Sequence, residues 1–255
     1  SRIGKLVIVG LITVLMTVST FSVLSFKSER ATVIIGVRID DAQQIENLRA
    51  RGAEIMADYN NGYVLARVSG PEIDYFEKLF DVEKMDVQRH IELAPSGISF
   101  DTGEGSPPIP NDLRYKKTTD EYIIQFIGPV KKDWIEEIER MGGAFYSYYR
   151  YYSFLVKVSP SKIPEVWGLP YVNWIGAYQP AYKISEGLMA GDGAQLIAVH
   201  AYDNVDSFEL TNKLDSMGAT IYMTSSSPPV VLVNAGSSMI PHIAALPDVL
   251  AIYPE

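Results

Sequence analysis

An Asp-Thr-Gly triplet at positions 101–103 matches the motif that carries the catalytic aspartate in two classes of protease. A serine protease of that kind also needs a histidine base before a glycine and a serine on a Gly-Thr-Ser turn. None of the three histidines, His90, His200 and His242, precedes a glycine, and the sequence has no such serine turn. An aspartic protease needs a second triplet to share the proton, and Asp215 begins none. We therefore expect Asp101 not to be catalytic and the protein not to be an enzyme.

The composition argues against cofactors, metals and nucleic acids. The histidines lack partners at helical spacing and the chain has no cysteine, so we expect no metal site. Neither a phosphate loop nor a dinucleotide fingerprint occurs, and we expect no cofactor. A formal net charge of −9 without a basic cluster would repel nucleic acid. For an exported chain, the absence of cysteine is typical of a prokaryote-type surface protein that is stabilised by packing alone.

A run of aromatic residues from Phe145 to Tyr152 is the strongest candidate for a binding surface. The tyrosines concerned are Tyr146, Tyr148, Tyr149, Tyr151 and Tyr152. Alternate residues of a strand face opposite sides of the sheet, so some of these rings must lie off the core. Tyrosine is enriched in interfaces because it offers a large contact area at low entropic cost. The run predicts either an interaction surface or a half-buried sheet covered by aromatic rings.

The tyrosines lie inside a segment, Tyr122 to Ile184, whose pattern is that of a complete small domain. Its apolar residues alternate between strand-like runs and a helical period. The expected elements are strands at 122–126, 145–152, 154–158 and 172–178, and helices at 131–141 and 160–167. Gly142 follows the first helix, as glycine usually does because it enters the left-handed conformation without strain. The order βαββαβ predicts a ferredoxin-like fold.

Two landmarks of this segment recur on both sides of it at nearly the same spacing. Gly52 lies 27 positions before Leu79, Gly142 lies 27 before Leu169, and Gly218 lies 28 before Leu246. Self-similarity of this kind indicates repeated units. We therefore predict an α+β chain of three tandem ferredoxin-like βαββαβ modules preceded by one hydrophobic α-helix. The expected boundaries are the helix in 1–30, modules at 31–93, 120–184 and 194–255, a Pro/Gly-rich linker at 94–119 and a short linker at 185–193.

Local signals refine this division. Asn61-Gly62 between two strand-like runs predicts a hairpin turn. Asp206 precedes a helical pattern and is expected to cap it. Because the second linker is short, the second and third modules should dock, whereas the first can sit apart.

The central and last modules resemble a known family. The strand at Tyr122 to Phe126, Gly142-Gly143-Ala144 after the helix, and Leu169-Pro170-Tyr171-Val172 look like the propeptide-type modules that precede the catalytic domain of subtilisin-like proteases. Leu246-Pro247-Asp248-Val249 is similar in the third module. These motifs mark where helices and strands begin and end, so the resemblance implies mainly a fold. It also implies a partner, a subtilisin-like protease whose cleft the modules would mask and whose folding they would assist.

Leu6 to Phe26 is a run of 21 residues without a charge, with basic residues on both sides. As a helix of about 1.5 Å per residue it would be roughly 31 Å long, enough to cross a bilayer core. A cleavable secretory signal fits its basic start, whereas its length and the lack of an Ala-x-Ala site favour a retained helix. Gly10, Thr13, Thr17 and Thr20 would share one helix face. Small residues on one face favour close packing with another copy, and the alternative is a lone anchor.

Two classes of function remain. In the first, the protein is a non-catalytic subunit of a cell-surface assembly, outside the cytoplasm. Residues 6–26 would enter a membrane or bundle with copies of the same chain, pilin-like, and the modules would project outward. In the second, which the family resemblance implies, the chain is a propeptide region that assists and inhibits a subtilisin-like protease. Family inhibitors use a tail after the last strand, and we expect none after the strand that ends near Glu255, which favours the first class.

Overall fold

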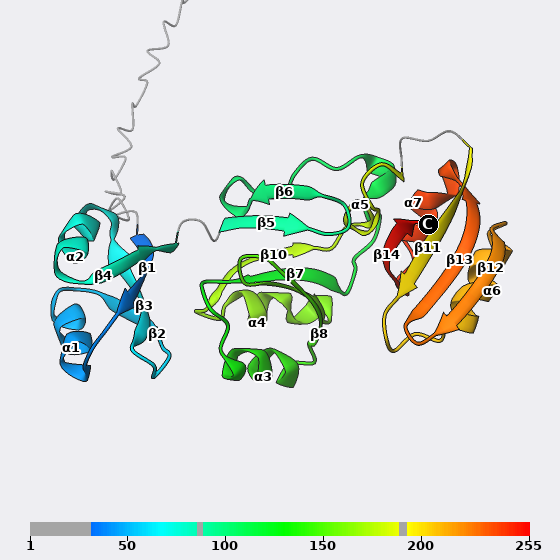
Figure 1. Cartoon of the computed structure of the whole chain (residues 1–255). Helices are drawn as coiled ribbons and strands as arrows, with labels where there is room; N and C mark the ends of the chain where they lie inside the picture. The colour runs from blue at the N-terminus through cyan, green and yellow to red at the C-terminus, as the bar shows by residue number, and fades with distance from the viewer. Residues whose placement is uncertain (1–31, 86–88, 189–192) are drawn as a thin grey trace, which may run out of the picture.

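The computed structural model describes residues 32–85, 89–188 and 193–255 (Figure 1). The chain is α+β, as the sequence predicted, and its described part contains four antiparallel sheets. Three sheets of four strands form a row of first, middle and third units, and a two-stranded hairpin is a fourth sheet that was not expected. No helix of the described residues is long and apolar enough to cross a membrane. The predicted N-terminal helix, with the face of Gly10, Thr13, Thr17 and Thr20, lies outside the described residues.

The first unit extends from strand β1 to strand β4. Its elements are β1 (Thr32–Arg38), α1 (Ala42–Ala50), β2 (Glu54–Asp58), β3 (Tyr63–Ser69), α2 (Ile73–Leu79) and β4 (Asp81–Lys84), in the sheet order β2-β3-β1-β4. The hairpin turn expected at Asn61-Gly62 joins β2 to β3, and Asn60 and Gly62 have positive φ. Leu48 of α1 and Phe76 of α2 pack into one apolar cluster with β1 and β3. Both helices therefore cover the same face of the sheet.

A hairpin follows, and it crosses the predicted boundary between the first module, 31–93, and the linker over 94–119. β5 (His90–Leu93) pairs with β6 (Ile98–Asp101), and two 3-10 turns, Thr102–Glu104 and Asn111–Leu113, come next. Apolar residues occupy alternate positions in both strands: Ile91, Leu93, Ile98 and Phe100. This alternation lets one side of the hairpin pack against the middle unit. These two strands were missed from the sequence because they are short and prolines and glycines, which indicate a linker, lie near them.

The middle unit has the elements that were predicted, with bounds that differ slightly. They are β7 (Glu121–Phe126), α3 (Lys132–Arg140), β8 (Ala144–Tyr149), β9 (Ser153–Lys157), α4 (Ile163–Trp167) and β10 (Val172–Ala177), in the order β10-β7-β9-β8. Gly142 follows α3 with a φ of 93°, the left-handed conformation predicted for it. Trp134 and Ile138 of α3 and Val166 of α4 pack on one face of the sheet. A short helix that was not predicted, α5 (Pro180–Lys183), follows β10.

The third unit repeats this order of elements. It consists of β11 (Ala194–Ala201), α6 (Ser207–Ser216), β12 (Thr220–Ser226), β13 (Pro229–Gly236), α7 (Ile240–Ala244) and β14 (Val249–Pro254), in the order β12-β13-β11-β14. Asp206 caps α6 as predicted, because its carboxylate accepts a hydrogen bond of 2.8 Å from the backbone N–H of Phe208. Leu210 and Leu214 of α6 and Ile243 of α7 cover one face of the sheet. In all three units the first strand lies between the third and the fourth.

The sequence allowed the first unit to sit apart from the others, but in the structure it packs against the middle unit. Leu65 and Met85 of the first unit belong to the same buried cluster as Phe126 and Ile127 of the middle unit. The hydroxyl of Tyr59 donates a hydrogen bond of 2.5 Å to the carbonyl of Pro129. The sheet face of the first unit that its helices leave open is therefore closed by the middle unit.

Replacing Gly128 by valine should loosen this contact. A Cβ at Gly128 would lie 2.5 Å from Cδ1 of Leu65, which is fully buried. We expect Gly128→Val to lower the free energy of unfolding by about 1–3 kcal/mol, as overpacking usually does. Denaturant unfolding would measure this, with Gly236→Val as the control, since the nearest atom to a Cβ at Gly236 is 4.0 Å away. Equal unfolding curves for the two variants would show that this packing is not tight.

Candidate functional site

Two of the five tyrosines proposed as an interaction surface lie at the junction of the middle and third units. The ring of Tyr146 packs edge-on against Tyr202, with the ring centres 4.6 Å apart. Tyr149 is buried, and its hydroxyl donates a hydrogen bond of 3.2 Å to that of Tyr178. These two side chains therefore contact other parts of the same chain.

The remaining three tyrosines each have different neighbours. Tyr151 packs edge-on against His90 of β5, with 5.6 Å between ring centres. Tyr152 packs against the apolar cluster that the first and middle units share. Tyr148 is the most exposed of the five, at 58%, although its ring contacts Phe154. The run thus joins the hairpin, the first unit and the third unit to the middle sheet, and only Tyr148 is largely free to contact anything else.

A buried ion pair lies at the same junction. Nζ of Lys183, at the end of α5, lies 2.8 Å from Oε2 of Glu121, at the start of β7, and both side chains are at most 1% exposed. Tyr202, which directly follows β11, donates a hydrogen bond of 2.6 Å to Oε1 of Glu121. Tyr115 donates another to Oε2. One carboxylate therefore binds donors from the segment before β7, from α5 and from the third unit.

A second lysine completes this group, which we call the junction cluster: Glu121, Lys183, Tyr115, Tyr202 and Lys157. Nζ of Lys157 lies 3.9 Å from Oε1 of Glu121 and 3.7 Å from the centre of the Tyr202 ring. The same amine donates a hydrogen bond of 2.8 Å to the carbonyl of Pro247, in the loop between α7 and β14. A cation over an aromatic face gains further electrostatic attraction. Lys157 therefore also connects the middle unit to the third.

The electrostatics of the cluster suit a structural role. Burial lowers the pKa of Lys183 to about 8, although the charge of Glu121 acts in the opposite direction. Burial and then the charge of Glu121 raise the pKa of Tyr115 and of Tyr202, so both hydroxyls keep their protons and donate. A lysine with a lowered pKa can act as a nucleophile, but Lys183 is fully buried and its amine is bound to Glu121. The cluster fastens the two units, and Tyr115 is its one member that also lines the cleft described next.

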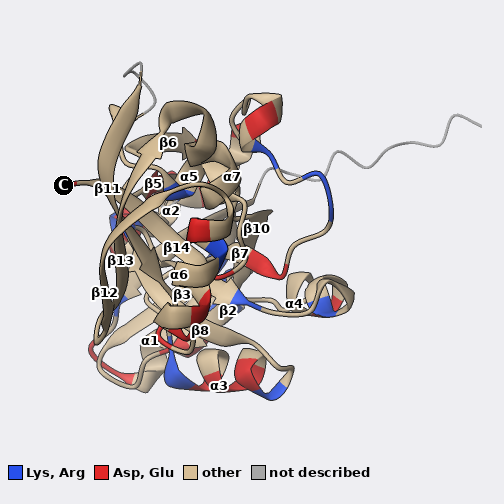
Figure 2. Ribbon diagram, turned by 90° about the vertical axis from the view of Figure 1, so that its right-hand side faces the viewer, with Lys and Arg blue, Asp and Glu red and all other residues tan. Residues whose placement is uncertain are grey.

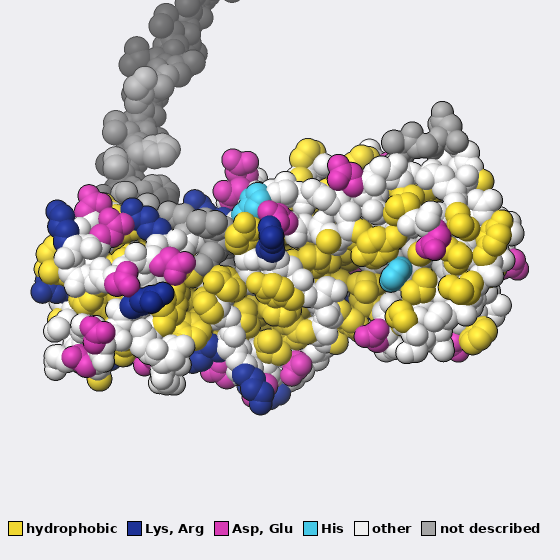
Figure 3. All heavy atoms as spheres, viewed as in Figure 1, with side chains coloured by type: hydrophobic (Ala, Val, Ile, Leu, Met, Phe, Trp, Pro, Cys, Tyr) yellow, Lys and Arg dark blue, Asp and Glu magenta, His cyan; other side chains and the backbone are white. Residues whose placement is uncertain are grey.

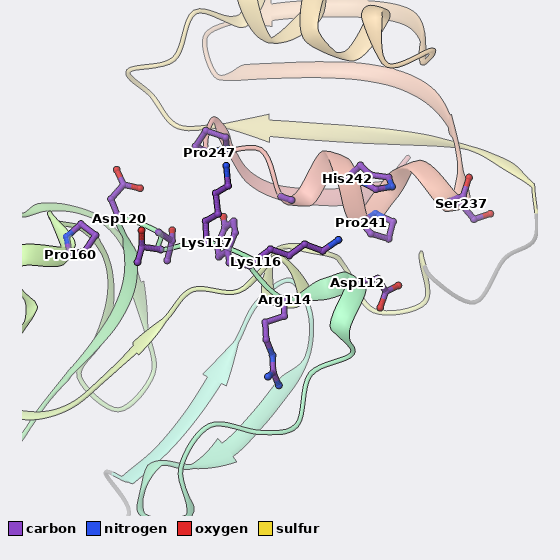
Figure 4. Close-up of a pocket in the computed structure, with 15 residues that line it drawn as sticks. Asp112, Arg114, Lys116, Lys117, Asp120, Pro160, Ser237, Pro241, His242 and Pro247 are labelled. Atoms are coloured by element: carbon purple, nitrogen blue, oxygen red, sulfur yellow. The ribbon is translucent and has the colours of Figure 1, made fainter.

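A cleft of about 1000 Å³ opens beside the junction cluster, between residues 112–120 and helix α7 (Figure 4). Lys116 extends toward Pro241 and His242, and Lys117 extends toward Pro247. Asp112 and Asp120 line the same space, so its charge is mixed. Figure 2 likewise shows Lys and Arg interspersed with Asp and Glu over the ribbon. The cleft does not select one charge of ligand.

Asp101 and His90 are cross-strand partners in the β5–β6 hairpin, whereas His200 and His242 lie in the third unit. Asp101 accepts a hydrogen bond of 2.7 Å from the backbone N–H of Gly103 and so caps a turn. His90 is bonded to Ser99, His200 packs against Tyr253, and His242 lines the cleft. Among the described residues no group of three or more His, Cys, Asp or Glu side chains could hold a metal ion.

Comparisons with known proteins add one finding about domain organisation. A family model described as a domain of unknown function (DUF8729) matches residues 81–179, less than half of the chain. The matched stretch starts at β4, includes the β5–β6 hairpin and ends just after β10. The hairpin and the middle unit therefore fall within one family unit. Searches of curated proteins and of solved structures found no match.

Proposed function

We propose that this protein is a non-catalytic, extracytoplasmic subunit of a cell-surface assembly, and that its three units are copies of one ferredoxin-like module. The observation that supports the proposal is that the chemically reactive side chains of the junction cluster hold the units together. Glu121 and Lys183, which could perform acid–base or nucleophilic chemistry, are buried and fasten the middle unit to the third. The tyrosine run is used in the same way. Units fastened in this way hold their outer surfaces in a fixed relative orientation. A subunit of an assembly needs this property, because its contacts with neighbouring copies must repeat with the same geometry.

The apolar N-terminal segment supplies the driving force in this proposal. Leu6 to Phe26 contains no charge, and each buried CH₂ group contributes about 0.8 kcal/mol. Burying many Leu, Val, Ile and Phe side chains outweighs the several kcal/mol that association costs. The segment is therefore covered by lipid, as an anchor, or by other copies of the chain, pilin-like, and either role keeps the protein at the cell surface.

Removing residues 1–31 tests the proposal. The full chain should form large particles without detergent, whereas a chain that starts at Thr32 should be mostly monomeric in light scattering. Thr17→Leu should weaken association by filling the face of Gly10, Thr13, Thr17 and Thr20, and Val18→Leu, beside that face, is its matched control. If the shortened chain forms the same particles, the units rather than the segment drive assembly and the pilin-like proposal fails.

A second candidate is the propeptide role that the family resemblance implies. It is favoured by the strand order shared by the units, with the first strand between the third and the fourth, which is the ferredoxin-like order of the propeptide-type modules. In this case the protein would bind a subtilisin-like protease and slow its hydrolysis of a peptide substrate. Unchanged protease activity at a large molar excess of this protein would remove the candidate.

A further inference from the structure

Each of the three sheets has an open face, meaning the face opposite its own two helices. A leucine of the third strand lies on each open face, paired with a residue of the first strand. The pairs are Leu65 with Gly36, Leu155 with Ile123, and Leu232 with Ala198. The three leucines therefore occupy corresponding positions. The burial of each leucine shows whether its open face is covered by another part of the chain.

The first two open faces are covered by other parts of the chain. Leu65 is fully buried because the middle unit packs against it, with Gly128 nearest. Leu155 is also fully buried, in a cluster with Ile91 and Leu93 of the β5–β6 hairpin. Closing the open face is thus the rule in this chain, although the covering element differs.

The open face of the third unit has no such cover among the described residues. One apolar row crosses all four strands in register: Tyr253, Ala198, Leu232 and Met223. Met223 is 51% exposed, Tyr253 is 37% exposed, and Leu232 is only half-buried. In Figure 3 hydrophobic side chains gather over the part of the molecule where β11 and β13 face the viewer in Figure 1. Contiguous exposed apolar surface, unlike a single exposed leucine, indicates an interaction site.

The charge of this face narrows the choice of occupant. The neighbouring positions on it carry leucine, valine, alanine and polar side chains: Leu196, His200, Thr220, Ser225, Val230, Asn234 and Ala251. None of these seven is Asp, Glu, Lys or Arg, and one acidic residue, Glu255, borders them at Leu196, whose carbonyl accepts a hydrogen bond of 3.2 Å from the backbone N–H of Glu255. An apolar row with a single charge at its border is matched best by an uncharged partner, since charges buried against the row would lose their hydration.

We propose that the open face of the third unit binds the apolar segment Leu6–Phe26 of a second copy of this chain. The segment has 21 residues without a charge, and the apolar row of Tyr253, Ala198, Leu232 and Met223 has none either. It precedes β1, in the first unit, and the first and third units lie at opposite ends of the row (Figure 1). The proposed contact joins the first-unit end of one copy to the third-unit end of the next. Each copy therefore supplies one segment and binds the segment of another copy on its open face. Such head-to-tail contacts extend into filaments, or close into rings if the rotation permits.

This inference rests on the proposed assembly function and specifies the surface that receives the segment. Photocrosslinking tests it in the full chain. Tyr253 is replaced by p-benzoyl-phenylalanine, and isotopically heavy and light chains are mixed before assembly in the absence of detergent. We expect the crosslinked peptides to join position 253 of one copy to residues 6–26 of another, in heavy–light pairs.

The other outcomes separate the alternatives. Crosslinks within one copy, crosslinks to the third unit of another copy, or an assembled sample without crosslinks would each overturn the proposal. Crosslinks to lipid, in a parallel sample with vesicles, would assign the face to a membrane instead and would also overturn it. If the unmodified full chain does not assemble at all, the proposed function itself fails, which light scattering shows before any crosslink is made.

A charge on the face provides an independent test. Met223→Asp changes a half-exposed side chain and should leave the fold intact, as a circular dichroism melt would verify. We expect it to raise the concentration needed for assembly roughly tenfold or more, because assembly would bury an unpaired carboxylate. Phe208→Asp is the matched control, since Phe208 is 64% exposed on α6, away from this face. Equal assembly of the two variants would contradict the proposal.

Discussion

Glu121→Ala is expected to lower the free energy of unfolding by about 3–5 kcal/mol, the cost of leaving one member of a buried ion pair without its partner. The variant would leave the amine of Lys183 buried without a carboxylate, and the hydroxyls of Tyr115 and Tyr202 without their acceptor. Denaturant unfolding of the full chain would measure the loss. Glu139→Ala is the control, because Glu139 is exposed on α3.

The double variant Glu121→Ala with Lys183→Met distinguishes the ion pair from simple packing. It removes both charges, so it should be less destabilised than the sum of the two single variants. Apolar replacements of buried pairs are often tolerated for this reason. Additive losses would mean that Glu121 and Lys183 do not interact as the structure has them, and that the junction cluster contributes through volume alone.

The pH dependence of stability is the second large effect that we expect. The pKa of Lys183 is about 8 in the folded chain, below its ordinary value of 10.5. Between these values the unfolded chain holds a proton that the folded chain has released, so stability should rise with pH from about 8 toward 10. Above about 10 the direction reverses. Tyr115 and Tyr202 have raised pKa values and stay protonated in the folded chain, whereas in the unfolded chain they ionise.

Unfolding curves at a series of pH values between 7 and 11 would measure this profile, with roughly constant ionic strength to keep the screening of surface charges equal. Lys183→Met should remove the rise and keep the fall. A wild-type profile that is flat or declining from pH 8 to 10 would show that Lys183 keeps its proton in the folded chain.

The sequence predicted the elements of each unit well because their signals are local. The helical spacing of Trp134 and Ile138 and the glycine after α3 depend on only a few neighbouring residues, and the structure has both. The β5–β6 hairpin was missed because its strands have four residues each, too short for a periodic pattern to outweigh the surrounding prolines and glycines.

The junction cluster could not be found by the same reasoning. Glu121 and Lys183 are 62 positions apart and meet only after the middle unit has folded. The sequence held one signal of their burial, because each is a charged residue next to an apolar or aromatic stretch. The tyrosine run was a similar case. Its composition indicated contacts, but whether the contacts lay within the chain or with a partner depended on the hairpin and the third unit, which pack around it.

Negative-stain imaging of the native full-length protein without detergent tests the central claim most directly. If the protein is an assembly subunit whose apolar segment is received by the third unit of the next copy, the images should show filaments or rings built from three-unit bodies, and removal of residues 1–31 should leave single bodies. A field of separate single bodies from the full-length protein would contradict it.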